Sequence, residues 1–325
     1  MKVFITGGSG FIGGHVIEAL AADHDVLALA RSDRSAATVR GYGAKAVAGA
    51  LEDVDAAMLA GVDAVVHVAA YVEEHGPEEA FWEANVIGTQ RVLDAAKAAG
   101  VRSFVHISSN ATVFTGRGQV DVDEDAPYVL DQVLPYCRTK AEAERRVLEA
   151  HGPSFRTVAL RPCFVWGPRD TSVLPALERM VAEGSFAWID GGRPRVSTTH
   201  VDNLVHAVQL ALEGRGPGGR SYFVTDGDDV TMREFIGGVA EAVGLDLPGR
   251  SLPGGLVRSV AWGLESTWAL FGWSGPPPIT RMAATLMSSD MTVKTDRARE
   301  ELGWAPVIDR ATGLARLGAT RRAAA

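Results

Sequence analysis

Cysteine is scarce in this chain: only Cys137 and Cys163 occur among 325 residues. Two cysteines cannot build the disulfide framework of a small secreted domain, and we expect no targeting segment ahead of the first apolar run. His-x-x-x-His and Cys-x-x-Cys spacings are also absent, so the sequence predicts no metal site. These absences favour a reducing, cytoplasmic compartment in which both thiols act as small apolar fillers.

Basic residues are outnumbered, with 32 Lys and Arg against 40 Asp and Glu, which gives a net charge of −8. Nucleic-acid binding draws on clustered Lys and Arg, so this balance argues against a nucleic-acid partner. The sequence shows no internal repeat. A long apolar stretch at residues 252–273 is interrupted by Arg258 and Glu265, so we do not expect it to span a membrane.

The N-terminal segment joins a short apolar run, a glycine-rich turn and helical spacing. Lys2–Thr6 is typical of a buried parallel strand. Gly7 permits a tight turn, Gly10 lets the backbone approach a pyrophosphate, and Gly13 lets a helix pack closely on the strand. The start of that helix would direct unpaired N–H groups and a positive dipole end at phosphates. The phosphate-binding residues are thus predicted to be Gly7, Gly10, Phe11, Ile12 and Gly13.

The second apolar run, residues 25–30, ends in Arg31 and Ser32 rather than in an acidic residue. An acidic residue there would bind the ribose 2′-hydroxyl of NAD, whereas an arginine accommodates the 2′-phosphate of NADP. We therefore predict NADP as the cofactor. A solvated Arg31 lying over the adenine is the alternative, and it is compatible with NAD.

Two further motifs carry chemistry that suits a nicotinamide cofactor. The run from Val101 ends in Ser108 and Ser109, which point to opposite faces of a strand, so only one of them can serve a site at its carboxyl edge. Pro135 then precedes a helical segment in which Tyr136 and Lys140 are four residues apart and share one face. A free tyrosine has a pKa of about 10, and a neighbouring cation lowers it.

In this order the motifs resemble those of the extended short-chain dehydrogenase/reductase family, within the NAD-dependent epimerase/dehydratase superfamily, and most closely its 3β-hydroxysteroid dehydrogenase-like branch. The resemblance implies that Tyr136 is the general acid/base. It also implies that Lys140 lowers the pKa of Tyr136 and holds the nicotinamide ribose, and that Ser109 binds the substrate oxygen. The Gly-x-x-Gly-x-x-Gly spacing matches this family.

Other landmarks extend the resemblance from Met1 to about Leu302. Asn85 opens a helix where the family has an asparagine supporting the catalytic strand, and residues 161–168 and 200–203 resemble its Arg-Pro…Gly-Pro and His-Val-Asp-Asp elements. The implied remaining cofactor contacts are Leu51, Ala69 and Pro162. Ala50 replaces the usual adenine-binding Asp, and Asn110 stands where dehydratases carry an acid, so elimination chemistry is not supported.

These observations predict an α/β fold, a doubly wound parallel sheet (Rossmann fold) with a smaller C-terminal α/β substrate lobe. The Rossmann domain would cover residues 1–170 with return segments at about 203–225. The lobe would cover residues 171–325, interleaved with the first domain.

The predicted function is hydride transfer between NADP(H) and a secondary alcohol or ketone on an apolar substrate, steroid-like or β-keto acyl/lipid-like. One alternative is a nucleotide-sugar epimerase with bound NAD, in which Arg193 or Arg195 would grip a diphosphate. A second alternative is a non-catalytic cofactor-sensing regulator. Relatives of that kind typically lack the Tyr-Lys pair.

Two features concern partners. The apolar stretch 252–273 is followed by Pro276–Pro278. It has three interpretations: core of the lobe, an interfacial helix in peripheral contact with a membrane, or a wall of the substrate pocket. We favour a combination in which the stretch is part core and part pocket. In the extended family the helices after Asn85 and at Tyr136 often pair with their copies. A homodimer is therefore predicted, from the apolar stripe Val86, Val92, Leu93, Ala95 and Ala96 and the small residues Ala141, Ala143 and Val147.

Overall fold

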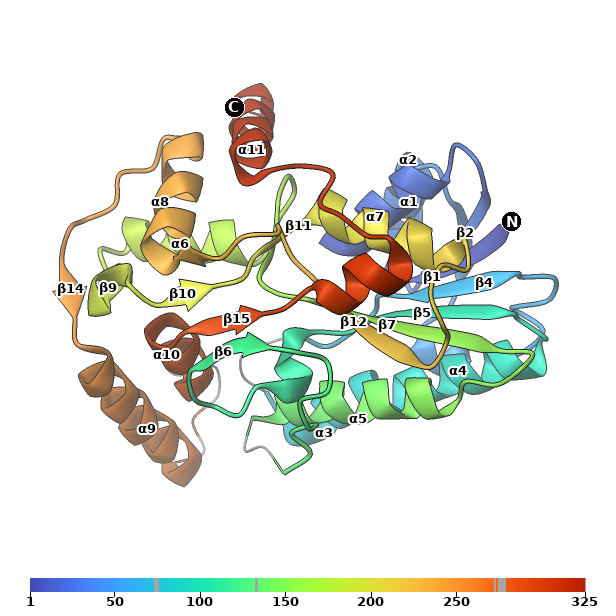
Figure 1. The fold of residues 1–325 in the computed structure, drawn as a ribbon, viewed down its shortest axis with the longest axis horizontal. Coiled ribbons are helices and arrows are strands. Elements are labelled where there is room, and N and C mark those ends of the chain that lie inside the picture. Colours follow the sequence, from blue (N-terminus) through green and yellow to red (C-terminus); the bar gives the residue numbers. More distant parts are fainter. Residues whose placement is uncertain (73–75, 132–133, 272, 274–278, 325) are drawn as a thin grey trace.

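The computed structural model describes residues 1–72, 76–131, 134–271, 273 and 279–324. Its centre is a seven-stranded parallel sheet in the order β12-β7-β5-β4-β1-β2-β3 (Figure 1). The strands are β1 (Lys2–Thr6), β2 (Asp25–Ala30), β3 (Lys45–Ala48), β4 (Ala64–His67), β5 (Ser103–Ile107), β7 (Arg156–Pro162) and β12 (Arg220–Val224). The prediction of a doubly wound parallel sheet is confirmed. Pro276–Pro278 lie outside the described residues.

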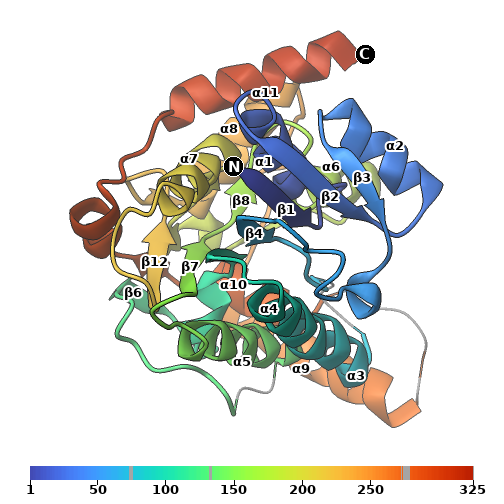
Figure 2. The ribbon, with the colours of Figure 1, turned by 90° about the vertical axis from the view of Figure 1, so that its right-hand side faces the viewer.

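Alternate residues of β1 separate the core into two layers. Val3 and Ile5 join the cluster under one set of helices, whereas Phe4 joins the cluster on the opposite face, as the alternation of a strand requires. The first set contains α1 (Phe11–Leu20), α2 (Asp33–Gly41) and α7 (Val201–Leu212), and the second contains α4 (Gly88–Ala98) and α5 (Pro135–Glu149). Figure 2 shows the two sets on either side of the sheet.

A second group of elements lies beyond the carboxyl edge of the large sheet (Figure 1). Its four-stranded sheet has the order β13-β10-β15-β6, and two-stranded pairs β8–β11 and β9–β14 accompany it. The strands are β6 (Gln119–Val122), β8 (Val165–Trp166), β9 (Trp188–Ile189), β10 (Arg195–Val196), β11 (Thr199–His200), β13 (Val230–Thr231), β14 (Ser251–Leu252) and β15 (Met291–Val293). The domain boundary at residue 170 stays a prediction.

Helices complete this second group and the connections. They are α3 (Glu78–Phe81), α6 (Val173–Ala182), α8 (Met232–Val243), α9 (Gly254–Phe271), α10 (Arg281–Ser288) and α11 (Arg310–Ala324). Single turns are η1 (Leu51–Asp53), η3 (Asn110–Val113) and η4 (Asp190–Gly192), and the π-helical segments are η2 (Trp82–Ile87) and η5 (Ala298–Leu302). Among the helices of the described residues, none is long and apolar enough to cross a membrane.

The apolar residues from which the sequence predicted a dimer are buried within the single chain. Val86, Val92, Leu93, Ala95 and Ala96 are each at most 7% exposed, and Ala141, Ala143 and Val147 are fully buried. They pack against the sheet and between α4 and α5. The exposed side of α4 carries Arg91, Asp94 and Lys97 instead. The stripe is therefore no broader than one buried face needs, and the dimer stays a prediction without this support.

Candidate active site

The turn between β1 and α1 leaves no room for side chains. Gly7 has a φ of +70°, and a Cβ there would lie 2.7 Å from the backbone nitrogen of Ala69. A Cβ on Gly13 would lie 2.2 Å from the carbonyl oxygen of Gly7. Gly10 caps α1 without a side-chain hydrogen bond, so the first N–H groups of the helix, at Phe11 and Ile12, point out of the turn. This cradle fits a pyrophosphate approached by backbone alone.

The other predicted cofactor residues lie at the same sheet edge, because parallel strands share the direction of their carboxyl ends. Arg31 and Ser32 follow β2 and are exposed, and the Ser32 hydroxyl caps α2 by accepting from the Ser35 N–H at 3.2 Å. Leu51 opens η1 after β3. The Ala69 N–H donates to Thr6 Oγ1 at 3.2 Å, and Pro162 ends β7.

Tyr136 and Ser109 meet at this edge. Pro135 takes the first position of α5, where its missing N–H costs nothing, and Tyr136 follows in the first turn. The Tyr136 phenol shares a hydrogen bond with the Ser109 hydroxyl, which also accepts from the Ala111 N–H at 3.1 Å. Burial raises the pKa of Tyr136 to about 12, and the Ser109 hydrogen bond opposes that rise.

Lys140 is buried one turn further along α5, beneath the end of β5. Its ammonium donates to the Ile107 carbonyl at 2.8 Å and lies 3.5 Å from His106 Nε2. Burial lowers the pKa of Lys140 to about 8, and the charge of Glu144 opposes that shift. Among the described residues, its hydrogen bonds run to β5 and not to the Tyr136 phenol. The sequence predicted that Lys140 lowers the pKa of Tyr136, whereas burial raises that pKa and the Ser109 hydrogen bond is what opposes the rise. Helical spacing places the two residues on one face, but the buried ammonium takes the nearest carbonyl.

Ser108 and Ser109 point in opposite directions, as alternation in a strand requires. The Ser108 hydroxyl donates to the buried carboxylate of Glu144, whereas the Ser109 hydroxyl bonds to Tyr136. That carboxylate also pairs with Arg161, Oε1 to Nη2 at 2.6 Å, and accepts from the Tyr128 hydroxyl at 2.9 Å. Both charged side chains are at most 2% exposed. Arg161 begins the run 161–168 that resembles the family's Arg-Pro…Gly-Pro element, and the structure buries its side chain in this network.

Sequence reasoning missed Glu144, although a signal existed. Glu144 follows Lys140 by four residues and therefore shares its helix face, which already had to be buried for Lys140 to reach the sheet. A carboxylate on a buried face requires a cation or several donors. Arg161, near the end of the buried strand β7, was the available partner.

Asn85 joins the loop after β4 to α5. Its side-chain oxygen accepts from the Tyr71 N–H at 2.7 Å, and its amide donates to the Tyr71 carbonyl and to Thr139 Oγ1, each at 3.1 Å. Asn85 lies in the π-helical segment η2, and such segments often mark functional sites. The asparagine thus fixes the distance between the β4 loop and the helix that carries Tyr136.

Two stacked histidines underlie Lys140. The rings of His67 on β4 and His106 on β5 have centroids 5.4 Å apart. His67 Nδ1 is 2.8 Å from Thr6 Oγ1, and its Nε2 is 2.9 Å from Thr89 Oγ1. Because the Thr89 hydroxyl donates to the Asn85 carbonyl, Nε2 must donate and Nδ1 must accept, which defines a neutral ring. Burial, with a smaller contribution from Lys140, lowers the pKa of His67 to about 3.

The buried His67 makes the fold sensitive to acid. Its folded pKa lies below its ordinary value of 6.5, so only the unfolded chain takes up this proton as the pH falls below 6.5. The stabilising effect is complete above that value and is lost on the way down to about 3. At about 1.4 kcal/mol per pH unit, His67 should remove roughly 2 kcal/mol of unfolding free energy between pH 6.5 and roughly pH 5.

Urea unfolding at both pH values tests this expectation, with His67→Asn as the comparison. The wild type should lose more stability than the variant by about that amount. Parallel losses in the two proteins would show that His67 is not the group responsible.

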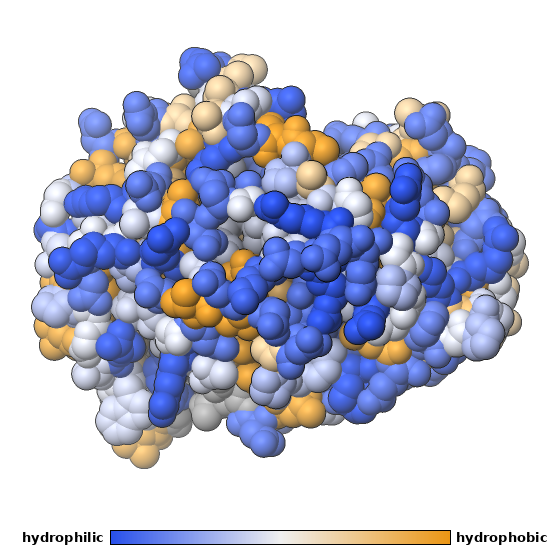
Figure 3. Space-filling view, viewed as in Figure 1, coloured by the Kyte–Doolittle hydropathy of each residue, from blue (hydrophilic) through white to orange (hydrophobic). Residues whose placement is uncertain are grey.

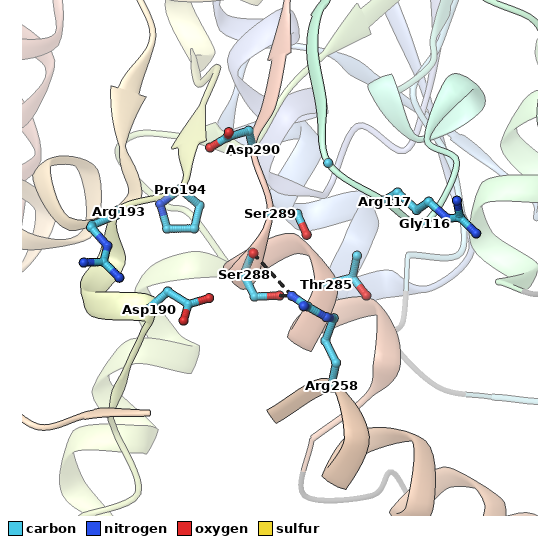
Figure 4. Close-up of a pocket in the computed structure, with 11 residues that line it drawn as sticks. Gly116, Arg117, Asp190, Arg193, Pro194, Arg258, Thr285, Ser288, Ser289 and Asp290 are labelled. Atoms are coloured by element: carbon cyan, nitrogen blue, oxygen red, sulfur yellow. Dashed lines mark hydrogen bonds between the residues drawn. The ribbon is translucent and has the colours of Figure 1, made fainter. Parts of the chain in front are cut away.

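A cavity of about 670 Å³ lies beside α10 and opens on the surface (Figure 4). Its walls are polar and include Arg117, Arg193 and Arg258, with Asp190 and Asp290 among them. Arg193, which the epimerase alternative assigned to a diphosphate, lines this cavity, whereas Arg195 does not. On another side of α10, Leu286 and Tyr136 pack on one cluster, formed by Ala111, Phe114, Cys137 and Met291. In the described part of the chain, no three His, Cys, Asp or Glu side chains gather as metal ligands.

The model of the 3-beta hydroxysteroid dehydrogenase/isomerase family matches residues 4–254. The chain is 39% identical over 317 residues to the 4-hydroxy-2-methyl-3-oxo-4-farnesyl-3,4-dihydroquinoline-1-oxide ketoreductase of Stigmatella aurantiaca, covering 97% of this chain and 95% of that protein. It is 34% identical over 332 residues to the 2-alkyl-3-oxoalkanoate reductase of Stenotrophomonas maltophilia, covering 99% and 100%.

The crystal structure of gox2253 has the same fold, with a TM-score of 0.80 and 28% identity over 99% of this chain and 98% of that one. The similarity therefore extends over nearly the whole chain. By its sequence and its fold, the chain belongs to the 3-beta hydroxysteroid dehydrogenase/isomerase family.

Proposed function

We propose that this enzyme, an NAD(P)-dependent dehydrogenase/reductase of the extended short-chain type, reduces a ketone on an apolar substrate to the secondary alcohol and catalyses the reverse reaction. The hydrogen bond between Tyr136 and Ser109 carries the proposal, because it presents two hydroxyl donors together at the sheet edge that holds the glycine turn. The relatives described above as a ketoreductase and an oxoalkanoate reductase support a ketone on a largely hydrocarbon substrate.

In this mechanism the carbonyl oxygen of the substrate replaces the Ser109–Tyr136 contact by accepting from both hydroxyls. A bound reduced nicotinamide would supply the hydride to the carbonyl carbon. Negative charge then grows on the oxygen, Tyr136 gives it the phenolic proton, and Ser109 stabilises it by hydrogen bonding. Lys140, which lies one turn along the same helix and whose buried ammonium donates to the Ile107 carbonyl, is the residue that would hold the nicotinamide ribose.

The cofactor residues present fit a dinucleotide. Gly7, Gly10 and Gly13 leave a backbone cradle without side chains, and the N-terminus of α1 faces it. Within that class we propose NADP, because the exposed Arg31 stands directly after β2, where an acidic residue would bind the ribose 2′-hydroxyl of NAD. Ser32 already uses its hydroxyl to cap α2, so Arg31 carries this preference.

Arg31→Asp should move the preference from NADP towards NAD, since it exchanges a phosphate partner for a hydroxyl acceptor. A charge-assisted hydrogen bond contributes about 1.5–3 kcal/mol, so the affinity ratio of NADP to NAD should fall roughly ten- to a hundred-fold. Titration of both cofactors against wild type, Arg31→Asp and the control Arg34→Asp measures it. Equal affinities for the two cofactors in the wild type would refute this role of Arg31.

A turnover screen tests the reaction itself. The purified enzyme should oxidise NADPH in the presence of a 2-alkyl-3-oxo acid or a 3-ketosteroid, and should leave UDP-glucose unchanged when NAD is supplied. Turnover of the sugar nucleotide alone would support the epimerase alternative and the Arg193 cavity instead. A protein that binds NADPH and turns over neither class would support the regulator.

Two further features of the enzyme belong to the proposal. A cytoplasmic location agrees with two free, buried cysteines, which a reducing compartment would keep as thiols. Dimerisation follows family behaviour, and light scattering at micromolar concentrations decides it.

A further inference from the structure

Helix α9 exposes apolar residues on the side that an ordinary surface helix gives to charged residues. A surface helix turns apolar residues to the core and charged residues to water. Only two of the 18 residues of α9 are charged, and both make hydrogen bonds to α10, although Arg258 stays exposed. Arg258 Nη1 donates to Ser288 Oγ at 2.7 Å, and Glu265 Oε1 accepts from the Arg281 N–H at 2.6 Å.

The opposite side of α9 is apolar and exposed. Residues of this side recur at helical spacing near the two ends of α9, and together with Leu252 before the helix and Trp273 after it they form an uncharged stripe. The stripe consists of Leu252 (45% exposed), Leu256 (56%), Val260 (46%), Leu270 (79%) and Phe271 (63%), with Trp273 (51%) at its end. Trp262, 60% exposed, lies on its flank. At about 1.5 Å per residue, an 18-residue helix extends this stripe over roughly 27 Å.

Core packing accounts for a different side of the helix. Val257 and Ala261 are buried against Ile189 and against Ala284 of α10, which confirms that the apolar stretch is partly core. The exposed stripe takes no part in that cluster. Apolar residues scattered singly on a surface need no explanation, but six large exposed apolar residues along one side of a helix and its two ends mark an interaction surface.

The charge around α9 indicates what the stripe contacts. From β14 to the end of α10, residues 251–288 contain Arg258, Arg281 and Glu265, a net charge of +1, whereas the whole chain has −8, so the remaining residues carry −9. Arg117 and Arg193 are exposed beside α9 in the cavity that Arg258 also lines (Figure 4). An uncharged stripe with exposed tryptophans and neighbouring arginines has the chemistry of an interfacial helix on a lipid surface.

The position of α9 also suits this partner. Figure 1 places α9 at the lower left extremity of the molecule, where Figure 3 shows mostly pale atoms with a small hydrophobic patch at the tip. Helix α10 lies between α9 and the catalytic edge, since its Leu286 packs on the same cluster as Tyr136. We propose that the α9 stripe docks the enzyme on the surface of a lipid bilayer. Docking there would bring membrane-dissolved apolar molecules next to α10.

Vesicle flotation tests the proposal without reference to activity, so its failure and that of the proposed reaction are distinguishable. The full-length protein should float with vesicles of phosphatidylcholine, and more strongly when the vesicles contain phosphatidylglycerol. Leu256→Glu/Leu270→Glu should reduce the bound fraction at least tenfold. The matched control Val120→Glu/Val307→Glu adds the same charge at residues 62% and 59% exposed and should bind like the wild type.

Circular dichroism and thermal unfolding should show both double variants folded, as expected for exposed positions. Absence of wild-type binding to both vesicle types would overturn the proposal, as would equal binding of the stripe variant. Light scattering tests the alternative that a second copy of this chain contacts the stripe. A wild-type dimer that the stripe variant alone converts to single chains would assign the stripe to a second copy of this chain and contradict the lipid surface.

Discussion

Tyr136→Phe should lower kcat for ketone reduction by about 10²–10⁴-fold, the usual contribution of a positioned proton donor. The substitution removes one oxygen atom and keeps the ring that packs with Leu286 and Met291. Its partner Ser109 retains the Ala111 contact and can still donate to the substrate oxygen. Binding of the cofactor depends on the glycine turn and should change little. Steady-state kinetics with a ketone, together with a cofactor titration, measures both quantities.

Tyr222→Phe is the matched control for this experiment. Tyr222 lies on β12, and its phenol is also largely buried, with a pKa likewise raised by burial. This phenol donates to Glu301 at 2.8 Å and not to Ser109. The control should keep near wild-type turnover. If Tyr136→Phe did the same, the proton would come from another group and the catalytic assignment would be wrong.

Much of this architecture follows from local patterns. A βα unit is predicted by the apolar run Lys2–Thr6, the glycine turn and the helical spacing of α1. These three local patterns indicate the same structure. The separation of Ser108 from Ser109 also follows from strand geometry alone. The family resemblance assigned Ser109, Tyr136 and Lys140 to one site from the sequence alone.

Other features depend on distances that sequence does not contain. The four-residue spacing of Tyr136 and Lys140 gives a shared helix face, but the direction of the ammonium depends on where β5 ends, and it points to the Ile107 carbonyl. The supposed dimer stripe failed for a related reason. How many apolar residues of α4 are buried depends on how closely the helix packs on the sheet and on α5. The periodicity of the sequence does not show that packing.

The α9 stretch illustrates a third limit. Apolar content alone left core, pocket wall and lipid contact as alternatives, with part core and part pocket favoured. The side of the helix that stays apolar depends on where Arg258 and Glu265 find partners. Both partners belong to α10, which follows in the chain. Tertiary contacts of this kind override the local expectation that charged residues face water.

The buried pair of Glu144 and Arg161 leads to the largest expected effect on stability. Arg161→Leu should lower the free energy of unfolding by about 3–5 kcal/mol, because it leaves the Glu144 carboxylate buried without its cation. Ser108 and Tyr128 would still donate to that carboxylate, but neutral donors compensate a buried charge only in part. Urea unfolding at neutral pH measures the loss.

A double variant distinguishes the cost of one unpaired buried charge from the contribution of the whole ion pair. Arg161→Leu/Glu144→Leu removes both charges and should recover much of the loss, since apolar replacement of a whole buried pair is often close to neutral. The exposed pair of Arg91 and Glu83, 2.8 Å apart, provides the control, and Arg91→Leu should change stability by less than about 1 kcal/mol. A loss of that small size in Arg161→Leu would contradict the buried pair as a main support of the β5 edge. A double variant that was folded yet slow in turnover would instead show that Ser108, once released from Glu144, no longer holds Ser109 in place.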